Sequence, residues 1–304
     1  MKIHKAKKSL GQNFLKSVPA LNAIVNAGEI KDTDTILEIG PGKGALTEKL
    51  LAKISTDKSG IGKVIAIEKD QDLLEFLKEK FAKEIEDKKF ILINEDILEH
   101  PLPTSPLAKG EGKYKIIANI PYNITGAILK KFLTAENQPE RMVLMVQNEV
   151  AKRIVARDGS ESILSISVKA YGNPKIIMKV PARYFSPAPK VDSAIIAITD
   201  INRDNFISKP PRPTDTPSYQ EENVGIARQD LAKLTFEERF WTLVKNGFAH
   251  KRKILISNLR TSPQPSPFKG EGVILKIFEN LHISEKARAE ELDLKDWLEI
   301  AKKL

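Results

Sequence analysis

Apolar residues follow two alternating patterns through the first part of the chain. Short apolar runs, which are typical of buried parallel strands, occur at 35–39, 63–68, 90–94, 114–118 and 142–146. Apolar residues spaced three or four positions apart, which are typical of amphipathic helices, occur at 18–27, 45–52, 70–83, 124–134 and 163–170. This alternation predicts right-handed βαβ units and therefore an α/β fold with a parallel, doubly wound sheet. Such a sheet binds ligands beyond the carboxyl ends of its strands.

The pattern changes near residue 200, and this change predicts two domains. Segments 175–180 and 191–198 can form an antiparallel pair that closes the sheet, so the first domain is predicted to span residues 1–200. Residues 201–234 lack apolar periodicity and are rich in proline, which predicts a poorly ordered linker. From 235 to 304 the spacing is helical throughout and predicts a small helical domain.

Composition narrows the class of protein. The length of 304 residues is enough for about two domains, and 41% hydrophobic residues are enough for a sizeable core. The sequence has no apolar run near the roughly 20 residues of a membrane-spanning helix. With no cysteine and only four histidines, we expect no metal centre. The basic start Met1–Lys8 is not followed by the apolar segment of a signal peptide, so we expect a cytoplasmic protein.

Charge favours a polyanionic partner such as a nucleic acid. The chain carries 49 Lys and Arg against 40 Asp and Glu, a net charge of +9. A Pro/Gly-rich sequence occurs twice, as Ser105–Gly112 within segment 104–112 and as Ser266–Gly272 within segment 262–272. We interpret both copies as surface insertions, because lengthening a loop costs little free energy. The alternative is that their lysines contact RNA.

A glycine-rich loop follows the first predicted strand of the sheet. Gly40, Gly42 and Gly44 permit a tight turn and the close approach of a ligand, while the next helix offers unpaired N–H groups. This spacing also satisfies the dinucleotide-binding pattern, and with either ligand Glu68 is placed to accept hydrogen bonds from ribose hydroxyls. The acid before the glycines, Glu38, gives the loop a pattern that resembles S-adenosylmethionine-dependent methyltransferases.

That resemblance implies S-adenosyl-L-methionine as the cofactor, a ligand that carries an ammonium and a sulfonium group in place of a pyrophosphate. It also gives Asp96, which follows the third predicted strand, the role of accepting a hydrogen bond from the adenine amino group of the cofactor. Alone, an Asp in this position is more often a helix cap.

The tetrapeptide Asn119-Ile120-Pro121-Tyr122 follows the fourth predicted strand. It resembles the motif of enzymes that methylate exocyclic amino groups of nucleobases, in the form found in RNA adenine-N6 dimethyltransferases. The nitrogen of an adenine amino group is a poor nucleophile because its lone pair is delocalised into the ring. Hydrogen bonds from N6–H to the Asn119 amide oxygen and to the Ile120 or Pro121 carbonyl favour a localised lone pair, and the Tyr122 ring offers a surface on which an extruded base stacks.

Two further segments resemble the same family. Lys8–Leu15 is similar to its N-terminal signature, which implies cofactor-binding roles for Asn13 and Leu15. Tyr184–Ser193 is similar to its late catalytic motif, whose Phe closes over the second face of the target adenine; that role falls on Phe185. Without the resemblance, a Phe in this setting is more often part of the core.

The matching motifs extend from Lys8 to Asp293, and the chain is similar to the KsgA/RsmA small-subunit ribosomal RNA dimethyltransferases. This resemblance implies a Rossmann-like S-adenosylmethionine methyltransferase sheet with a small C-terminal helical domain. It implies an enzyme that dimethylates N6 of two adjacent adenines in the 3′-terminal hairpin loop of 16S ribosomal RNA, within the nascent pre-30S particle. Neither a membrane nor a metal ion is part of this expectation.

In the helical domain, Phe248–Ile254 resembles the aromatic and basic helix of the family. Lys251, Arg252 and Lys253 are suited to phosphate contacts, and the alternative interpretation is a solvated charged face. One departure from the family is Glu161-Ser162-Ile163, which stands where Tyr-Gly commonly precedes Leu-Ser.

Three alternatives stay open at this stage. A large-subunit ribosomal RNA methylase that confers antibiotic resistance shares the catalytic motifs. An assembly factor for the particle retains the fold without catalysis, although the intact Asn119 and Tyr122 argue against it. A nicotinamide-dependent oxidoreductase has a similar sheet but leaves the Asn-Ile-Pro-Tyr motif unexplained.

Overall fold

The computed structural model describes residues 6–54, 62–100, 113–207, 235–260 and 271–304. Contacts between residues divide the chain into two compact units. The sheet unit comprises Met1–Val155 and Gly172–Asn202, and the helical unit comprises Ala156–Tyr171 and Arg203–Leu304.

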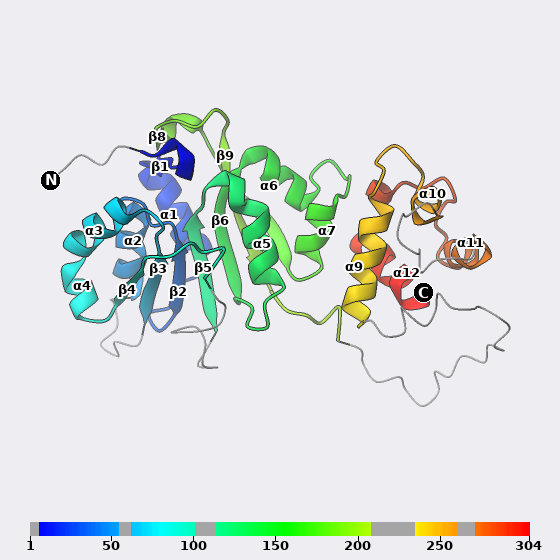
Figure 1. Ribbon diagram of the computed structural model, residues 1–304, viewed down its shortest axis with the longest axis horizontal. Coiled ribbons are helices and arrows are strands. Elements are labelled where there is room, and N and C mark those ends of the chain that lie inside the picture. The colour runs from blue at the N-terminus through cyan, green and yellow to red at the C-terminus, as the bar shows by residue number, and fades with distance from the viewer. Residues whose placement is uncertain (1–5, 55–61, 101–112, 208–234, 261–270) are drawn as a thin grey trace. The chain divides into compact units, whose positions relative to one another are not determined.

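The sheet unit is built on seven strands in the order β4-β3-β2-β5-β6-β9-β7 (Figure 1). In this order the strands are β4 (Phe90–Ile93), β3 (Lys63–Ile67), β2 (Thr35–Ile39), β5 (Tyr114–Asn119), β6 (Arg141–Gln147), β9 (Ser193–Thr199) and β7 (Asn173–Val180). The first five are parallel, and β9 runs antiparallel to both of its neighbours. The predicted parallel sheet and its closing antiparallel pair are therefore confirmed.

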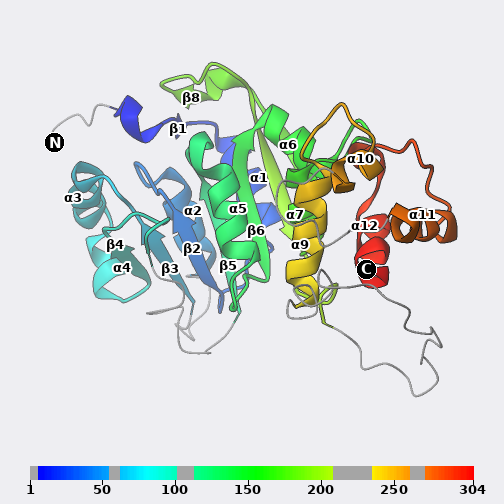
Figure 2. The same cartoon turned by 45° about the vertical axis from the view of Figure 1, so that its right-hand side comes forward.

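Helices of the sheet unit lie on both faces of the sheet (Figures 1 and 2). They are α1 (Val18–Ala27), α2 (Ala45–Ile54), α3 (Gln71–Lys80), α4 (Ala82–Glu86), α5 (Thr125–Leu133) and α6 (Asn148–Val155). Central strand residues such as Leu37, Ile117 and Val143 are fully buried. This burial on both faces explains why the parallel strands are continuous apolar runs in the sequence.

One predicted helix, 70–83, is two helices in the structure. It breaks at Phe81, whose backbone lies outside the helical region, with φ −113° and ψ 30°. The Phe81 ring is buried and packs edge-on against Phe90, with 5.2 Å between ring centroids. Helical periodicity continues across the break, so the sequence pattern did not reveal it. Helix α6 was not predicted, because it follows β6 directly and is short.

The N-terminal segment pairs with a segment about 170 residues further along the chain. After a 3₁₀ turn at Lys8–Leu10, strand β1 (Phe14–Leu15) pairs antiparallel with β8 (Phe185–Ser186), so that Leu15 lies opposite Phe185. A second 3₁₀ turn, Ala182–Tyr184, precedes β8. This pairing holds together two segments that the sequence analysis identified separately.

The helical unit contains α7 (Ile163–Lys169), α9 (Phe236–Gly247), α10 (Leu255–Arg260), α11 (Glu271–Asn280) and α12 (Leu294–Lys303), with a 3₁₀ turn at Ala289–Glu291. Trp297 of α12 is fully buried, and Thr235, the N-cap of α9, forms a capping box with Glu238. The helical pattern predicted from residue 235 onward is therefore present in the described residues.

The division into units differs from the predicted domains at two places. Residues 156–171, which the sequence analysis assigned to the first domain, pack with the C-terminal helices. Tyr171 stacks on Trp241 at 6.1 Å between ring centroids, and its hydroxyl donates to Glu237 at 2.5 Å. Phe206, which falls in the predicted linker, packs 5.3 Å from Tyr171. These aromatic contacts join segments far apart in sequence, which local periodicity cannot indicate.

The rest of the predicted linker, residues 208–234, lies outside the described residues, and so does the first Pro/Gly-rich copy at 104–112. Of the second copy, residues 262–270 lie outside the described residues, and Glu271 and Gly272 begin α11.

Candidate functional site

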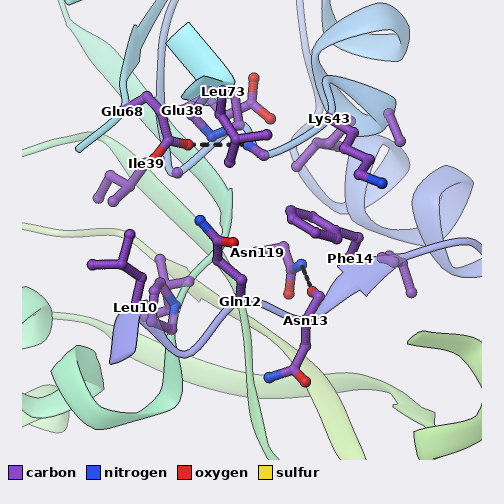
Figure 3. A pocket seen from close by; sticks show the side chains of 18 of the residues that line it. Leu10, Gln12, Asn13, Phe14, Glu38, Ile39, Lys43, Glu68, Leu73 and Asn119 are labelled. Carbon is purple, nitrogen blue, oxygen red and sulfur yellow. Dashed lines mark hydrogen bonds between the residues drawn. The ribbon is translucent and has the colours of Figure 1, made fainter. Parts of the chain in front are cut away.

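A cavity of about 780 Å³ opens at the carboxyl ends of β2, β3 and β5 in the sheet unit (Figure 3). The N-terminal segment, the glycine-rich loop and the Asn-Ile-Pro-Tyr motif all line it. Of the predicted site residues, the cavity is lined by Asn13, Leu15, Glu38, Gly40, Gly42, Glu68, Asp96, Asn119, Ile120, Pro121 and Tyr122. The position agrees with the general rule for ligands of parallel sheets.

The glycine-rich loop needs its glycines for two different reasons. Gly40, Gly42 and Gly44 have φ values of +64°, +59° and +75°, in a backbone region that residues other than glycine rarely adopt. At Gly44 a Cβ would also lie 2.5 Å from the Phe81 ring, and at Gly42 it would lie 3.0 Å from the Phe14 ring. Gly44 does not line the cavity, so its role in the structure is to pack the loop against Phe81.

Glu38, at the fourth position of β2, is a carboxyl group almost completely removed from water. It is 1% exposed, and the Thr47 hydroxyl of α2 donates to its Oε2 at 2.7 Å. Burial is the main reason that the pKa of Glu38 is raised to about 8; the bond from Thr47 opposes the shift, and the nearby Glu68 adds to it. At neutral pH this burial therefore favours the protonated form of the carboxyl group.

Glu68 follows β3 and reaches across to the glycine-rich loop (Figure 3). Its Oε2 accepts from the backbone N–H of Gly42 at 3.3 Å, and its Oε1 accepts from that of Asp70 at 2.9 Å. Burial raises the pKa of Glu68, although these backbone bonds oppose the rise. A hydrogen-bond acceptor is thus held at the end of the strand, facing the cavity.

Asp96 lies at another part of the cavity wall. Its Oδ2 accepts from the Lys69 ammonium group at 2.7 Å, and its Oδ1 accepts from the backbone N–H of Leu98 at 2.9 Å. The bond from Lys69 is the main reason that the pKa of Asp96 is lowered. Asp96 is therefore an ionised acceptor that also caps the turn after it, so the two interpretations of this residue are compatible.

Asn119, the last residue of β5, is held by the N-terminal segment. Its Nδ2 donates to the main-chain carbonyl of Asn13 at 3.2 Å (Figure 3). The Asn13 side chain itself donates to the carbonyl of Gly11 at 3.1 Å. Because the amide nitrogen of Asn119 is used in this way, its oxygen is the atom left to accept a bond from a ligand. The Pro121 carbonyl already accepts from Ile124 N–H at 3.3 Å, which favours the Ile120 carbonyl as the second acceptor.

Tyr122 lines the cavity and is anchored at its hydroxyl. The hydroxyl shares a hydrogen bond of 2.5 Å with Ser193, a fully buried residue at the start of β9. Burial raises the pKa of Tyr122, and the bond to Ser193 opposes the rise. Ser193 is the last residue of the motif Tyr184–Ser193, and the sequence alone predicts no role for it. The structure makes it a positioning residue for the Tyr122 ring.

A second contact that the sequence analysis missed ties the N-terminal segment down over the cavity. Asp70, the N-cap of α3, accepts hydrogen bonds from Lys7 Nζ at 2.5 Å and from Gln12 Nε2 at 2.7 Å. Burial favours a high pKa for Asp70, but the bonds from Lys7 and Gln12 outweigh it, and the net effect lowers the pKa. In the sequence, the position of Asp70 two residues after Glu68 is the one feature that could have indicated this contact.

Comparison with known proteins decides the family. Residues 3–209 match the family model described as "Ribosomal RNA adenine dimethylase". The chain belongs to that family. The protein is therefore an S-adenosylmethionine-dependent methyltransferase of the ribosomal RNA adenine dimethylase family, and its sheet is the Rossmann-like sheet of that class.

The similarity to curated relatives covers nearly the whole length of this chain. The chain is 39% identical over 295 residues to "Ribosomal RNA small subunit methyltransferase A" of Dehalococcoides mccartyi (strain CBDB1), which covers 96% of this chain and 86% of the relative. The protein of the same name from Nostoc sp. is 34% identical, with 97% and 96% of the two chains covered. A solved dimethyladenosine transferase from Plasmodium falciparum has a TM-score of 0.68 and 26% identity, and covers 94% of this chain and 95% of its own. The 23S ribosomal RNA methyltransferase ErmE, at 23% identity and a TM-score of 0.66 over 96% of this chain and 99% of its own, shares the fold.

Phe185, the remaining residue of the predicted catalytic set, lies outside the lining of the adenine dimethylase cavity. It is 3% exposed and belongs to the same hydrophobic core cluster as Leu15, its partner across β1 and β8. The structure therefore does not bring the Phe185 and Tyr122 rings to opposite sides of one space. In this structure Phe185 is a core residue.

The predicted basic helix is a turn. Lys251, Arg252 and Lys253 are exposed residues between α9 and α10. The turn is fixed by Asn258, whose Nδ2 donates to the carbonyls of Gly247 at 2.6 Å and His250 at 3.1 Å. Periodicity could not reveal this side-chain bond, which ends α9 before the basic residues.

The described residues contain no group of three or more His, Cys, Asp or Glu side chains arranged to hold a metal ion. Among the helices in the described parts of the chain, none is long and apolar enough to cross a membrane.

Proposed function

We propose that this protein transfers two methyl groups to N6 of each of two adjacent adenines in the 3′-terminal hairpin loop of 16S ribosomal RNA. The substrate is the nascent pre-30S particle in the cytoplasm, and the reaction is a step of ribosome biogenesis. The observation that supports this proposal best is that one cavity is lined by the buried acids Glu38 and Glu68 as well as by Asn119 and Tyr122. A methyl donor and a target adenine that are bound in one cavity react without having to diffuse together.

The residues of the cavity fit S-adenosyl-L-methionine. This cofactor is a cation without phosphates, and two acceptors of low exposure, Glu38 and Glu68, face the glycine-rich loop. We assign Glu38 to the ammonium side of the cofactor, Glu68 to the ribose hydroxyls and Asp96 to the adenine amino group. Gly40 and Gly42 let the backbone approach, and Gly44 packs the loop. We also assign Asn13 and Leu15, which line the cavity, to cofactor binding; the Asn13 carbonyl accepts from Asn119, and Leu15 lies opposite Phe185 of β8.

When bound, the cofactor supplies an electrophilic methyl group; the residues of the chain prepare the nucleophile. The Asn119 amide oxygen and the Ile120 carbonyl accept hydrogen bonds from the target amino group, which localises its lone pair. Pro121 fixes the backbone between them, and Tyr122, held by Ser193, stacks on the extruded base. An amide is no general base at neutral pH, so the proton leaves to solvent. If Phe185 is to cover the second face of the base, it has to leave the core.

Methyl transfer from labelled S-adenosylmethionine to small-subunit particles that lack the modification tests this proposal. The modified nucleosides are identified and mapped along the RNA. Dimethyladenosine at two adjacent adenines of the loop is the expected result. Binding of cofactor and particle without transfer identifies an assembly factor instead, and modification of large-subunit RNA alone identifies a resistance methylase.

The affinity for the cofactor is expected to depend on pH through Glu38. Because the pKa of Glu38 in the free protein is about 8, binding of a cation beside it releases a proton at lower pH. The dissociation constant for S-adenosylmethionine should fall by about tenfold per pH unit as the pH rises toward 8, and then level off. Isothermal titration calorimetry in buffers of different ionisation enthalpy measures both the affinity and the released proton.

Glu38→Gln is the control for this prediction, because it keeps the shape and removes the titration. The variant should bind more weakly above pH 8 and show no slope below it. A second readout is stability without cofactor. Folding raises the pKa of Glu38 from 4.5 to about 8, so between these two pH values the folded state binds more protons than the unfolded state. The free energy of unfolding of the wild type should therefore fall as the pH rises through this window. A Glu38→Gln variant with the same pH slopes as the wild type contradicts the assignment.

We assign docking on ribosomal RNA to the helical unit, through the exposed turn of Lys251, Arg252 and Lys253. Replacement of all three by Gln should weaken binding to the particle by about tenfold, because each exposed contact contributes modestly. Sedimentation of the particle with the protein measures this binding. Deletion of residues 235–304 is a poorer test, since it removes the packing partners of Tyr171 and Phe206.

A matched control for the docking variant is Lys276→Gln/Lys286→Gln/Lys295→Gln, which removes the same charge from exposed positions outside the turn. This control should bind the particle like the wild type. Equal weakening in the two triple variants would mean that only the net charge matters, and that the turn has no special role.

A further inference from the structure

Charges around the cavity are separated by depth. The acids Glu38 and Glu68 are 1% and 6% exposed, whereas Lys16 and Lys43, which line the same cavity, are exposed to solvent. Lysines line the cavity at five positions, namely Lys16, Lys43, Lys49, Lys69 and Lys80. Three further acids, Glu48, Glu95 and Asp96, line the cavity nearer to solvent. The interior is therefore acidic, and at the mouth the five lysines outnumber the acids.

Among the described residues, two of these lysines form ion pairs with carboxylates and three do not. Lys69 pairs with Asp96 at 2.7 Å, and Lys80 pairs with Glu48 at 2.8 Å. For Lys16, Lys43 and Lys49, the described part of the chain offers no carboxylate within 4.0 Å. We call these three residues the lysine rim.

The backbone of the lysine rim is well fixed. Lys16 follows β1, and its N–H donates to the Tyr184 carbonyl at 2.8 Å. Lys43 belongs to the glycine-rich loop, and its Nζ lies 5.1 Å from the centroid of the Phe14 ring (Figure 3). Lys49 is on α2, whose N-terminus at Ala45 adds the positive end of a helix dipole to the same region.

A cationic cofactor does not need this rim, because ammonium groups repel it. A polyanion does: nucleic acids are held mainly by Lys and Arg contacts to phosphates, and these contacts orient the base that enters a site. Given the proposed function, on which this inference rests, we propose that the lysine rim binds the RNA phosphates that flank the target adenine and thereby directs its base toward Asn119 and Tyr122.

The test compares Lys16→Gln/Lys43→Gln/Lys49→Gln with the wild type in binding to an RNA hairpin that carries the 3′-terminal loop of the small subunit. Fluorescence anisotropy is measured between about 50 and 200 mM salt. The variant should bind the hairpin about tenfold more weakly. Its slope of log affinity against log salt should be smaller by about 2, since each phosphate contact to a single strand contributes about 0.7. The dissociation constant for S-adenosylmethionine should stay at the wild-type value.

The matched control is Lys31→Gln/Lys83→Gln/Lys175→Gln, three exposed lysines of the sheet unit that do not line the cavity. It removes the same charge, so an equal loss of hairpin affinity in both variants overturns the inference in favour of a general charge effect. Weaker binding of S-adenosylmethionine to the rim variant overturns it in favour of a contact to the cofactor carboxylate. Failure of the wild type to methylate particles is a different result, because it rejects the proposed function. The difference in hairpin affinity between the rim variant and its control does not depend on that result.

Discussion

Asn119→Ala is expected to bind S-adenosylmethionine like the wild type and to lose most of its turnover, by about a hundredfold to a thousandfold. Removing one preorganised hydrogen-bonding group from a transition state costs about this much in comparable sites. In this protein the group is the Asn119 amide oxygen, because its nitrogen donates to the Asn13 carbonyl at 3.2 Å. Single-turnover methyl transfer measures the chemical step, and calorimetry measures cofactor affinity separately.

The controls for this variant separate chemistry from positioning. Asn119→Asp keeps an acceptor oxygen but loses the bond to the Asn13 carbonyl, so it should retain more activity than Asn119→Ala. Its melting temperature reports whether the N-terminal segment is still held. Full turnover in Asn119→Ala would overturn the catalytic assignment, and weaker cofactor binding would place Asn119 in the cofactor site instead.

Glu68→Ala is expected to weaken S-adenosylmethionine binding by about tenfold to a hundredfold, since a hydrogen bond to a charged group contributes about 1.5–3 kcal/mol. The Glu68 carboxylate also accepts from the N–H groups of Gly42 and Asp70, so its loss frees the glycine-rich loop as well as removing a ligand for the ribose. Equilibrium dialysis with labelled cofactor measures the affinity.

A comparison with the 2′-deoxyribose and 3′-deoxyribose analogues of the cofactor separates the two effects. If Glu68 accepts from the ribose hydroxyls, the wild type should discriminate against the analogues and Glu68→Ala should not. Glu68→Gln, which keeps an acceptor for the loop, should show an intermediate affinity. An unchanged dissociation constant in Glu68→Ala is incompatible with the ribose role.

Local sequence patterns predicted most of the strands and helices, and the strand ends at which the site residues lie. Apolar runs predicted the parallel strands because those strands are buried on both faces, as Leu37 and Ile117 illustrate. Glu38, Glu68 and Asn119 could be assigned to strand ends because parallel strands bring their carboxyl ends to one edge. The break at Phe81 and the turn at Lys251–Lys253 escaped prediction, because side-chain packing and a bond from Asn258 override periodicity there.

The sequence by itself determined which polar residues of the site lie at the end of which strand. Strands, loops and helices are each indicated by patterns of only a few residues, so these positions can be predicted locally. Tertiary structure alone decided how those residues are held. The bond between Asn119 and Asn13 spans 106 residues, and that between Tyr122 and Ser193 spans 71. It also placed Phe185 in the core opposite Leu15, rather than in the cavity. Contacts of this range depend on strand register and on packing between distant segments, and no local pattern contains that information.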